Sequence, residues 1–331
     1  MNKLKLKPLS EQVIVITGAG SGIGAATAKA AARAGARVVL AGRDEAALGE
    51  VAKAIHAEGG EAISVVMDVG RQEDHSQLLQ RAQESFGAVD TWVNNAGVSI
   101  FGDLLTVPLE DQRQLFETTY WGVVYGSLTA AAYLKERGGA LVNVGSEVSD
   151  RAIPLQGAYS AAKHAVKGFT DALRMELRTQ EAPVSVTLIK PASIDTGFTR
   201  HARNYMDVEP TLIPPVYAPE LVADAILYAA CTPARDVYVG SAAAMMGSLG
   251  QRVSGVMDRL AGWMTRRQRS DVPATHDGDA LYEPGLRTSA PRPSNVRRHS
   301  VYTQLRTHGG GMLWVGAGAL LLLGTAMTRR R

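Results

Sequence analysis

The chain has 331 residues, 46% of them hydrophobic, which is enough to bury a core in one large domain or two. Cys231 is the only cysteine and no cluster at metal-ligand spacing accompanies it, so a disulfide framework and a cysteine-based metal site are excluded. The net charge of +3 conceals a basic C-terminal part, because residues 241–331 hold 13 of the 35 Lys and Arg but only 5 of the 32 Asp and Glu. A basic segment of this kind favours binding to a membrane surface over binding to nucleic acid, since no nucleic-acid motif is present.

The N-terminal part of the sequence predicts a strand, a glycine loop and a helix. The basic first ten residues lack an apolar signal core, which argues against secretion. The β-branched run 13–16 predicts a buried strand, and the Ala-rich segment that ends at Ala34 predicts a helix. Between them, the glycines of Thr17-Gly-Ala-Gly-Ser-Gly-Ile-Gly24 let the backbone approach a diphosphate at the helix N-terminus. The spacing Gly-x-x-x-Gly-x-Gly therefore predicts a dinucleotide site, of a different branch from Gly-x-Gly-x-x-Gly, rather than a loop built only for packing.

The second predicted strand decides the cofactor. It covers residues 37–41 and ends at Gly42-Arg43-Asp44, where a dinucleotide fold meets the adenosine ribose. A carboxylate at this strand end would bind the ribose hydroxyls and repel a 2′-phosphate, whereas the guanidinium of Arg43 would attract one. We therefore expect NADP(H) in preference to NAD(H). Asp44 is the alternative that favours NAD, but it precedes a helical sequence and is better interpreted as a helix N-cap.

Strands and helices continue to alternate along the chain. Strands are predicted at 62–67 and 91–93, with a helix at 77–86 between them. The pattern predicts an α/β protein with a Rossmann-type, doubly wound parallel sheet in three αβα layers. Asp68-Val69 and Asn94-Asn-Ala-Gly97 follow strand ends, where ligands of such sheets bind, although ordinary turn chemistry explains Asp68 equally well.

A third group of polar residues follows the buried strand predicted at 140–144. Ser146 comes directly after this strand, and Tyr159 and Lys163 lie four residues apart on a predicted helix, so they project from one face. A phenol titrates near pH 10, but an ammonium held close favours the phenolate and brings proton exchange toward neutral pH. The loop between strand and helix could place Ser146 opposite Tyr159 across a reacting carbonyl oxygen. An isolated Tyr-x-x-x-Lys is common by chance, so this interpretation depends on the cofactor motifs.

Together, Thr17-Gly-x-x-x-Gly-x-Gly24, Asn94-Asn-Ala-Gly97, Ser146 and Tyr159-x-x-x-Lys163 resemble the motifs of the classical short-chain dehydrogenase/reductases, over roughly residues 10–240. The resemblance implies hydride transfer between a nicotinamide cofactor and an alcohol or carbonyl, often in dimers or tetramers. It implies catalytic roles for Ser146, Tyr159 and Lys163, with Thr119 at the position of a fourth catalytic residue. It also implies cofactor contacts from Gly18, Ser21, Gly22, Ile23, Gly24, Asp68, Val69, Asn95, Ala96, Gly97, Tyr159, Lys163, Pro191, Ile194 and Thr196.

The sequence departs from the family pattern at two positions. Thr119 stands where similar enzymes carry a catalytic Asn, and a hydroxyl cannot present an amide's paired donor and acceptor groups. A water-mediated proton relay toward Lys163 would therefore be altered. Ala192 stands where relatives often have Gly after the proline, which narrows backbone freedom beside the nicotinamide. Contacts to the carboxamide from the Ile194 backbone and the Thr196 hydroxyl are still expected.

The segment after the predicted strand 184–189 suggests the substrate. In the family that this chain resembles, residues 197–217 would form a substrate lid, and a helix at 219–230 and a strand at 237–239 would complete the core. The lid is apolar, which indicates a lipid-like or otherwise hydrophobic substrate, although packing is an alternative explanation. The lid residues in question are Phe198, His201, Tyr205, Met206, Leu212, Ile213, Pro214 and Pro215.

The C-terminal part predicts three further regions after a catalytic domain at 1–240. Apolar residues recur every three to four positions over 242–267, so residues 241–269 predict one amphipathic helix, which either lies in a membrane interface or, as we favour, packs over the substrate mouth. Residues 270–308 are rich in Pro, Ser, Arg and Gly and predict a loose connector.

The end of the chain, 309–331, predicts a membrane anchor. Residues 309–328 carry no charge, precede three arginines and at about 1.5 Å per residue would reach roughly 30 Å, the thickness of a bilayer core. We interpret them as an anchor that leaves the catalytic domain in the cytoplasm. The alternatives are a buried or peripheral apolar helix and a soluble cytoplasmic protein.

The sequence thus leads to two hypotheses from different classes. The first is an NADP(H)-dependent oxidoreductase that interconverts a carbonyl and an alcohol on a hydrophobic small molecule. In it Tyr159 exchanges the proton, Ser146 orients the oxygen and Lys163 binds the cofactor ribose. The second is a nucleotide-binding membrane scaffold with relaxed chemistry, for which Thr119 is the best argument and the intact Ser-Tyr-Lys set the counter-argument.

Overall fold

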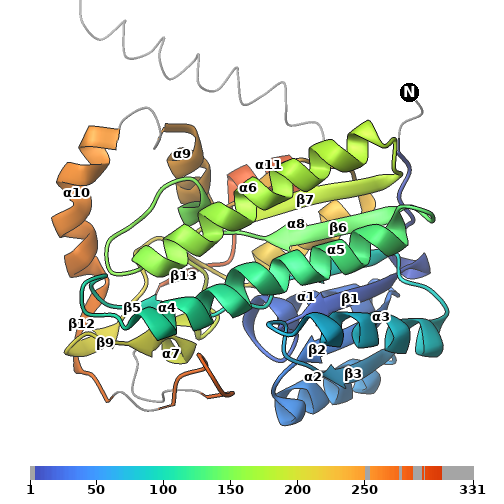
Figure 1. Cartoon of the computed structure of the whole chain (residues 1–331), viewed down its shortest axis with the longest axis horizontal. Coiled ribbons are helices and arrows are strands. Elements are labelled where there is room, and N and C mark those ends of the chain that lie inside the picture. The colour runs from blue at the N-terminus through green and yellow to red at the C-terminus, as the bar shows by residue number, and fades with distance from the viewer. Residues whose placement is uncertain (1–3, 250–253, 276–277, 286–292, 294, 308–331) are drawn as a thin grey trace, which may run out of the picture.

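A seven-stranded parallel sheet forms the centre of the computed structural model, which describes residues 4–249, 254–275, 278–285, 293 and 295–307 (Figure 1). The strand order is β11-β7-β6-β4-β1-β2-β3. The Rossmann-type doubly wound sheet predicted from the sequence is therefore confirmed. The strands are β1 (Val13–Thr17), β2 (Arg37–Gly42), β3 (Ala62–Val66), β4 (Thr91–Asn94), β6 (Gly139–Val144), β7 (Val184–Pro191) and β11 (Asp236–Val239).

Helices cover both faces of this sheet and produce the three αβα layers (Figure 1). Helix α3 begins at Gln72, earlier than the predicted residue 77. The prediction missed the first turn because that turn is polar and carries no hydrophobic periodicity. One face is covered by α1 (Gly22–Arg33), α2 (Glu45–Ala57) and α8 (Glu220–Cys231), and the other by α3 (Gln72–Phe86), α5 (Gly122–Leu134) and α6 (Gly157–Thr179).

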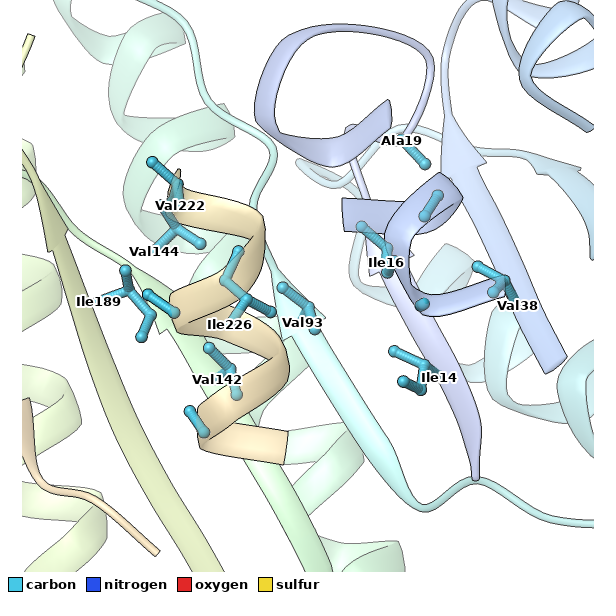
Figure 2. Close-up of a cluster of buried hydrophobic side chains, with 14 of the residues drawn as sticks. Ile14, Ile16, Ala19, Val38, Val93, Val142, Val144, Ile189, Val222 and Ile226 are labelled. Carbon is cyan, nitrogen blue, oxygen red and sulfur yellow. The ribbon is translucent and has the colours of Figure 1, made fainter. Parts of the chain in front are cut away.

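Successive side chains of β1 alternate between the two layers of core. Ile14 and Ile16 belong to the cluster that also contains side chains of α1 and α8, and Figure 2 shows Val93 of β4 between them and Ile226. Val13 and Val15 belong to the cluster on the opposite face. A strand that is buried on both faces needs an apolar residue at every position, which explains the continuous β-branched run in the sequence.

The predicted lid, residues 197–217, lies beyond the carboxyl end of β7. It consists of short elements rather than one long helix: α7 (Phe198–His201), β8 (Arg203–Asn204), β9 (Val208–Pro210) and β10 (Val216–Tyr217). Strand β8 pairs in parallel with β5 (Ile100–Phe101), so the lid is attached to the chain that leaves β4.

The amphipathic segment after β11 differs from its prediction. A single helix was expected over 242–267, whereas the structure has two, α9 (Ser241–Leu249) and α10 (Ser254–Arg267), with residues 250–253 outside the described part (Figure 1). Glycines at 247, 250 and 255 lower the helix propensity of this segment. The prediction used only the spacing of apolar residues, which does not depend on these glycines.

The expected loose connector, 270–308, is packed against the lid in its described parts. Strand β12 (Arg269–Pro273) pairs antiparallel with β9, and β13 (Val296–Arg297) pairs in parallel with β10. A last helix, α11 (Val301–Thr307), is held by a hydrogen bond from the Gly240 amide to the Thr303 hydroxyl at 3.0 Å. Composition predicted a connector because few of these residues are apolar, but their order comes from backbone pairing with lid strands far away in the sequence.

The proposed anchor, 309–328, lies outside the residues that the structure describes. Within the described residues, no helix has the length and apolar character required to cross a bilayer.

Candidate active site

A cavity of ≈ 940 Å³ opens at the carboxyl edge of the sheet and brings most of the predicted site residues together. Its lining runs from the glycine loop after β1, past the ends of β4, β6 and β7, to the lid. The predicted residues that line it are Gly18, Ser21, Gly22, Ile23, Arg43, Val69, Asn95, Ala96, Gly97, Ser146, Tyr159, Lys163, Pro191, Ile194 and Thr196.

Three glycines of the loop, Gly18, Gly22 and Gly24, occupy positions that tolerate no side chain and make the loop a glycine cradle. Gly18 has φ +65° and Gly22 has φ +52°, which L side chains rarely adopt. A Cβ at Gly24 would lie 2.1 Å from the Gly18 carbonyl oxygen, and one at Gly18 would lie 2.9 Å from the Cα of Ala96. Helix α1 starts at Gly22, and the amides of a first helical turn have no intrahelical partners. The loop therefore fits a diphosphate, with its backbone close to the ligand and a positive helix end facing it.

Thr17 and Asn95 hold this cradle against the end of β4. The Thr17 hydroxyl accepts hydrogen bonds from the amides of Asn95 and Ala96, at 3.0 and 3.1 Å. The Asn95 side-chain amide donates to the carbonyl oxygen of Thr17 at 2.9 Å. These bonds fix the distance between the glycine loop and the end of the neighbouring strand β4.

Ser146, Tyr159 and Lys163 converge at the end of β6. The Ser146 side chain hydrogen-bonds the phenol of Tyr159, which is 9% exposed. The Lys163 ammonium lies 5.7 Å from the centre of the Tyr159 ring and donates to the Val144 carbonyl oxygen at 2.8 Å. Phe198 of the lid packs edge-on against Tyr159, with ring centres 5.3 Å apart.

Burial dominates the ionisation of these groups. It raises the pKa of Tyr159 above its usual value, an effect opposed by the bond to Ser146 and reinforced by the charge of Glu147. Burial also lowers the pKa of Lys163 to about 8. In this state the phenol is protonated at neutral pH, whereas the sequence analysis expected Lys163 to favour the phenolate. The protonated phenol is the form that can give a proton to a carbonyl oxygen.

Three predicted residues do not line the cavity. Gly24 lies beneath the loop against Gly18, and the Asp68 carboxylate accepts a hydrogen bond from the Gly70 amide at 2.9 Å, which is ordinary turn chemistry. Thr119 is fully buried in a π-helical turn (Glu117–Trp121). Its hydroxyl donates to the Val98 carbonyl oxygen and accepts from the Val98 amide, both at 3.1 Å. Thr119 thus fixes the backbone after Gly97.

Arg43 lies at the far end of the cavity and has partners that the sequence did not suggest. Its guanidinium donates to the carbonyl oxygens of Ala280 at 2.5 Å and Tyr282 at 2.7 Å. These belong to residues 278–285, which we call the C-terminal strap; Leu281 of the strap is fully buried. Asp44 is the predicted N-cap of α2, since its carboxylate accepts from the Ala47 amide at 3.0 Å.

The apolar wall of the cavity comes from the lid and from the two helices after β11. Among the lid residues named from the sequence, Tyr205 and Met206 face elsewhere; Met206 packs in a small core cluster, and the Tyr205 hydroxyl donates to Asp111. Both helices of the segment 242–267 contribute residues to this wall, which agrees with the packing role that we favoured. The wall residues are Phe198, His201, Leu212, Ile213, Pro214, Pro215, Ala242, Met245, Leu260, Trp263 and Met264.

Sequence reasoning missed the strap and Glu147 as parts of this site. Ala280, Pro284 and Gly285 line the cavity, but no motif distinguishes them within a polar segment. Glu147 also lines the cavity, directly after Ser146 in the chain, and no sequence motif marks it. Among the described residues, no cluster of three or more His, Cys, Asp or Glu could hold a metal ion.

A doubly wound sheet with a glycine cradle at its carboxyl edge defines a Rossmann-type nucleotide-binding protein. The chain matches the family described as short chain dehydrogenase over residues 12–207, and it belongs to that family. It is therefore an oxidoreductase that acts on CH–OH or C=O groups with a nicotinamide cofactor.

Relatives along most of the chain carry oxidoreductase names. The uncharacterized oxidoreductase YxnA of Bacillus subtilis is 45% identical over 309 residues, which cover 91% of this chain and 87% of YxnA. The ketoacyl reductase HetN of Nostoc is 29% identical over 77% of this chain and 90% of its own length. The solved alcohol dehydrogenase of Thermococcus sibiricus, complexed with 5-hydroxy-NADP, superposes with a TM-score of 0.60 at 28% identity, over 69% of this chain and 95% of that one.

Proposed function

We propose that this protein is an NADP(H)-dependent oxidoreductase that interconverts a carbonyl and an alcohol on a hydrophobic small molecule. The observation that carries the proposal is the convergence of Ser146, Tyr159 and Lys163 on the cavity that also contains the glycine cradle. The bound cofactor supplies or accepts the hydride at the carbon atom. The residues of the chain then orient the oxygen and move its proton.

Tyr159 gives its proton to the carbonyl oxygen during reduction and takes it back during oxidation. Its hydrogen bond with Ser146 supports this role, because a second hydroxyl at the same point orients the substrate oxygen and stabilises the phenolate that is left. Lys163, 3% exposed, binds the ribose hydroxyls and supplies a positive charge near the phenolate. A nicotinamide positioned by Ile194 and Thr196 agrees with their place in the cavity wall.

The preference for NADP(H) rests on Arg43. No carboxylate follows β2 in the position that would bind free ribose hydroxyls, because Asp44 caps α2 instead. Two of the five N–H donors of Arg43 bind strap carbonyls, which leaves donors for a 2′-phosphate. The relative from Thermococcus, solved with an NADP derivative, is consistent with this choice.

Replacing Arg43 by Ala tests the cofactor preference. Because hydrogen bonds to a charged group contribute about 1.5–3 kcal/mol, we expect the affinity for NADPH to fall about 10- to 150-fold while that for NADH changes little. Titration of both cofactors by fluorescence measures the ratio. The change also releases the strap, but a loosened strap would weaken both cofactors alike. An unchanged ratio of affinities would rule out Arg43 as the phosphate ligand, and Arg33→Ala, on a surface ion pair, is the matched control.

A hydrophobic substrate is the choice that the cavity wall supports best. The reacting oxygen would lie near Ser146 and Tyr159, and the remainder of the substrate would contact Phe198, Met264 and other apolar side chains of the lid and α10. Burial of an apolar ligand in such a wall stabilises it by about 25 cal/mol per Å². Long-chain and aromatic ketones are therefore the first compounds to assay with NADPH.

The membrane anchor stays a hypothesis that rests on the sequence of residues 309–328 alone. We expect the full chain to float with phospholipid vesicles in a density gradient, and a chain that ends at His308 to remain in the dense fractions. If both chains stay at the bottom of the gradient, the terminal segment is not an anchor.

A further inference from the structure

Glu147 places a carboxyl group inside the apolar part of the cavity. It begins the short helix η3 (Glu147–Ser149), directly after Ser146, and its side chain contributes to the cavity lining next to Val148. The helix is well fixed, since the Ser149 amide donates to the Ser146 carbonyl oxygen at 3.0 Å and the Asp150 amide to that of Glu147 at 3.2 Å. The carboxyl group is therefore held beside the reacting centre by a rigid turn.

No group in the described part of the chain hydrogen-bonds or ion-pairs with this carboxyl. Lys163, a cation that lines the same cavity, donates instead to the Val144 carbonyl oxygen. Burial raises the pKa of Glu147 to about 7. The Glu147 side chain is half-buried at the cavity wall, and a carboxyl withdrawn from most of the solvent is costly without a partner, so such a group calls for an explanation. The other carboxyl on this loop, Asp150, follows the rule, with two lysines and a tyrosine around it.

We propose that Glu147 is a substrate-recognition residue and that its partner is a hydrogen-bond donor on the substrate, a hydroxyl or an ammonium group. The substrate class is then an apolar carbonyl or alcohol compound that carries one such donor in addition to the reacting oxygen. Glu147 sits next to Ser146 along the chain, so the donor lies on the part of the substrate nearest the reacting carbon. The inference rests on the proposed function and specifies its substrate.

Two features of the site agree with this role. The lid and the two helices after β11 contribute mostly apolar side chains to the cavity, so a polar contact at Glu147 would fix the orientation of a substrate that is otherwise held by nonspecific burial. The charge of Glu147 also raises the pKa of Tyr159, third after burial and the opposing bond from Ser146. The charge of Glu147 thereby favours the protonated phenol that reduction requires. A donor bound to Glu147 would change the pKa of Tyr159, the proton donor.

The test uses methyl ketones of increasing chain length that end in a methyl, a hydroxyl or an ammonium group. Consumption of NADPH gives kcat and KM, and calorimetry on the full chain gives the affinity for the same ketones independently of turnover. At the length that reaches Glu147, we expect ketones with a donor to exceed their methyl-ended analogues at least about tenfold in kcat/KM, through KM, because a charge-assisted hydrogen bond replaces an unpaired group.

Two variants separate recognition from structure. Glu147→Gln retains an acceptor, so the preference for the hydroxyl should persist while that for the ammonium is lost. Glu147→Leu should abolish both preferences and improve the methyl-ended ketones. Glu84→Gln, the same change on an exposed carboxyl outside the cavity, should leave the ratios unchanged.

The outcomes distinguish this inference from the proposed function. Turnover of all three series without a donor preference, or ratios that survive in Glu147→Leu, would overturn the inference and leave the proposed function standing. A donor preference in binding without any NADPH consumption would support the inference and count against the proposed function. Neither turnover nor selective binding would count against both.

Discussion

Replacing Tyr159 by Phe is expected to lower kcat for carbonyl reduction by about 10²- to 10⁴-fold, the range that a positioned general acid contributes. Phe retains the ring that packs against Phe198 and removes only the hydroxyl that bonds Ser146. Binding of NADPH should therefore remain, because the glycine cradle and Lys163 are unchanged. Steady-state assays and a fluorescence titration measure the two quantities separately.

The control for this variant is Tyr133→Phe on α5. The Tyr133 hydroxyl accepts a bond from the Val89 amide at 3.4 Å and is not part of the cavity, so kcat should be unchanged. If Tyr159→Phe kept the kcat of the parent chain, Tyr159 would not be the proton donor and the proposed mechanism would fail. If it lost NADPH binding instead, the phenol would serve the cofactor site rather than the proton transfer.

Replacing Asp150 by Ala is expected to destabilise the fold by about 3–5 kcal/mol, the usual effect of removing one partner from a buried ion pair. Asp150 is 6% exposed and Lys190, its partner on β7, is 2% exposed. The carboxylate accepts from the Lys190 ammonium at 3.1 Å, from Lys167 of α6 at 2.8 Å and from the Tyr238 hydroxyl of β11 at 2.9 Å. Urea unfolding followed by circular dichroism measures the loss.

The same group predicts the direction of the pH dependence. Burial opposes ionisation of Asp150, but the bonds from Lys167 and Lys190 outweigh it, and the net pKa is lowered. A lowered folded-state pKa means that this stabilisation is present above the ordinary pKa of Asp, about 3.9, and is lost as the pH falls through the folded-state value. Asp150→Ala should therefore flatten the acid limb of the stability profile. Glu58→Gln, on an exposed pair with Arg33, should alter neither the free energy of unfolding nor its pH dependence. An equal effect of the two changes would contradict the explanation by a buried ion pair.

The position of Asp150 links stability to the site. It ends the turn that carries Ser146 and Glu147, and its bonds attach that turn to α6, β7 and β11. We expect activity to fall together with stability when Asp150 is lost, because the hydroxyl and the carboxyl of the turn are no longer held at the cavity.

The candidate site could be predicted from the sequence where local motifs carry the geometry. The glycine loop needs positive φ angles and close approach, so its glycines are visible in the sequence itself. Tyr159 and Lys163 share one helix face because of helical periodicity. Asp44 as an N-cap followed from the same local reasoning. Thr119 was correctly noticed as unusual, but its bonds to Val98 depend on a π-helical turn that no sequence pattern indicated.

Long-range pairing could not be predicted. Nothing in residues 278–285 indicates that their carbonyl oxygens bind Arg43, more than 200 residues earlier in the sequence. The strands β12 and β13 have no hydrophobic alternation, because they are held by backbone hydrogen bonds to β9 and β10 rather than by apolar side chains.

The sequence by itself determined the parallel sheet, the succession of strands and helices along the chain and the position of the glycine loop, since each depends on periodicity or backbone freedom within a few residues. Only the tertiary structure decided that the C-terminal strap and α10 line the cavity, that burial keeps Tyr159 protonated and that Glu147 has no partner among the described residues. The burial of a group and its hydrogen-bond partners depend on the residues that surround it, and these residues are dispersed along the whole chain.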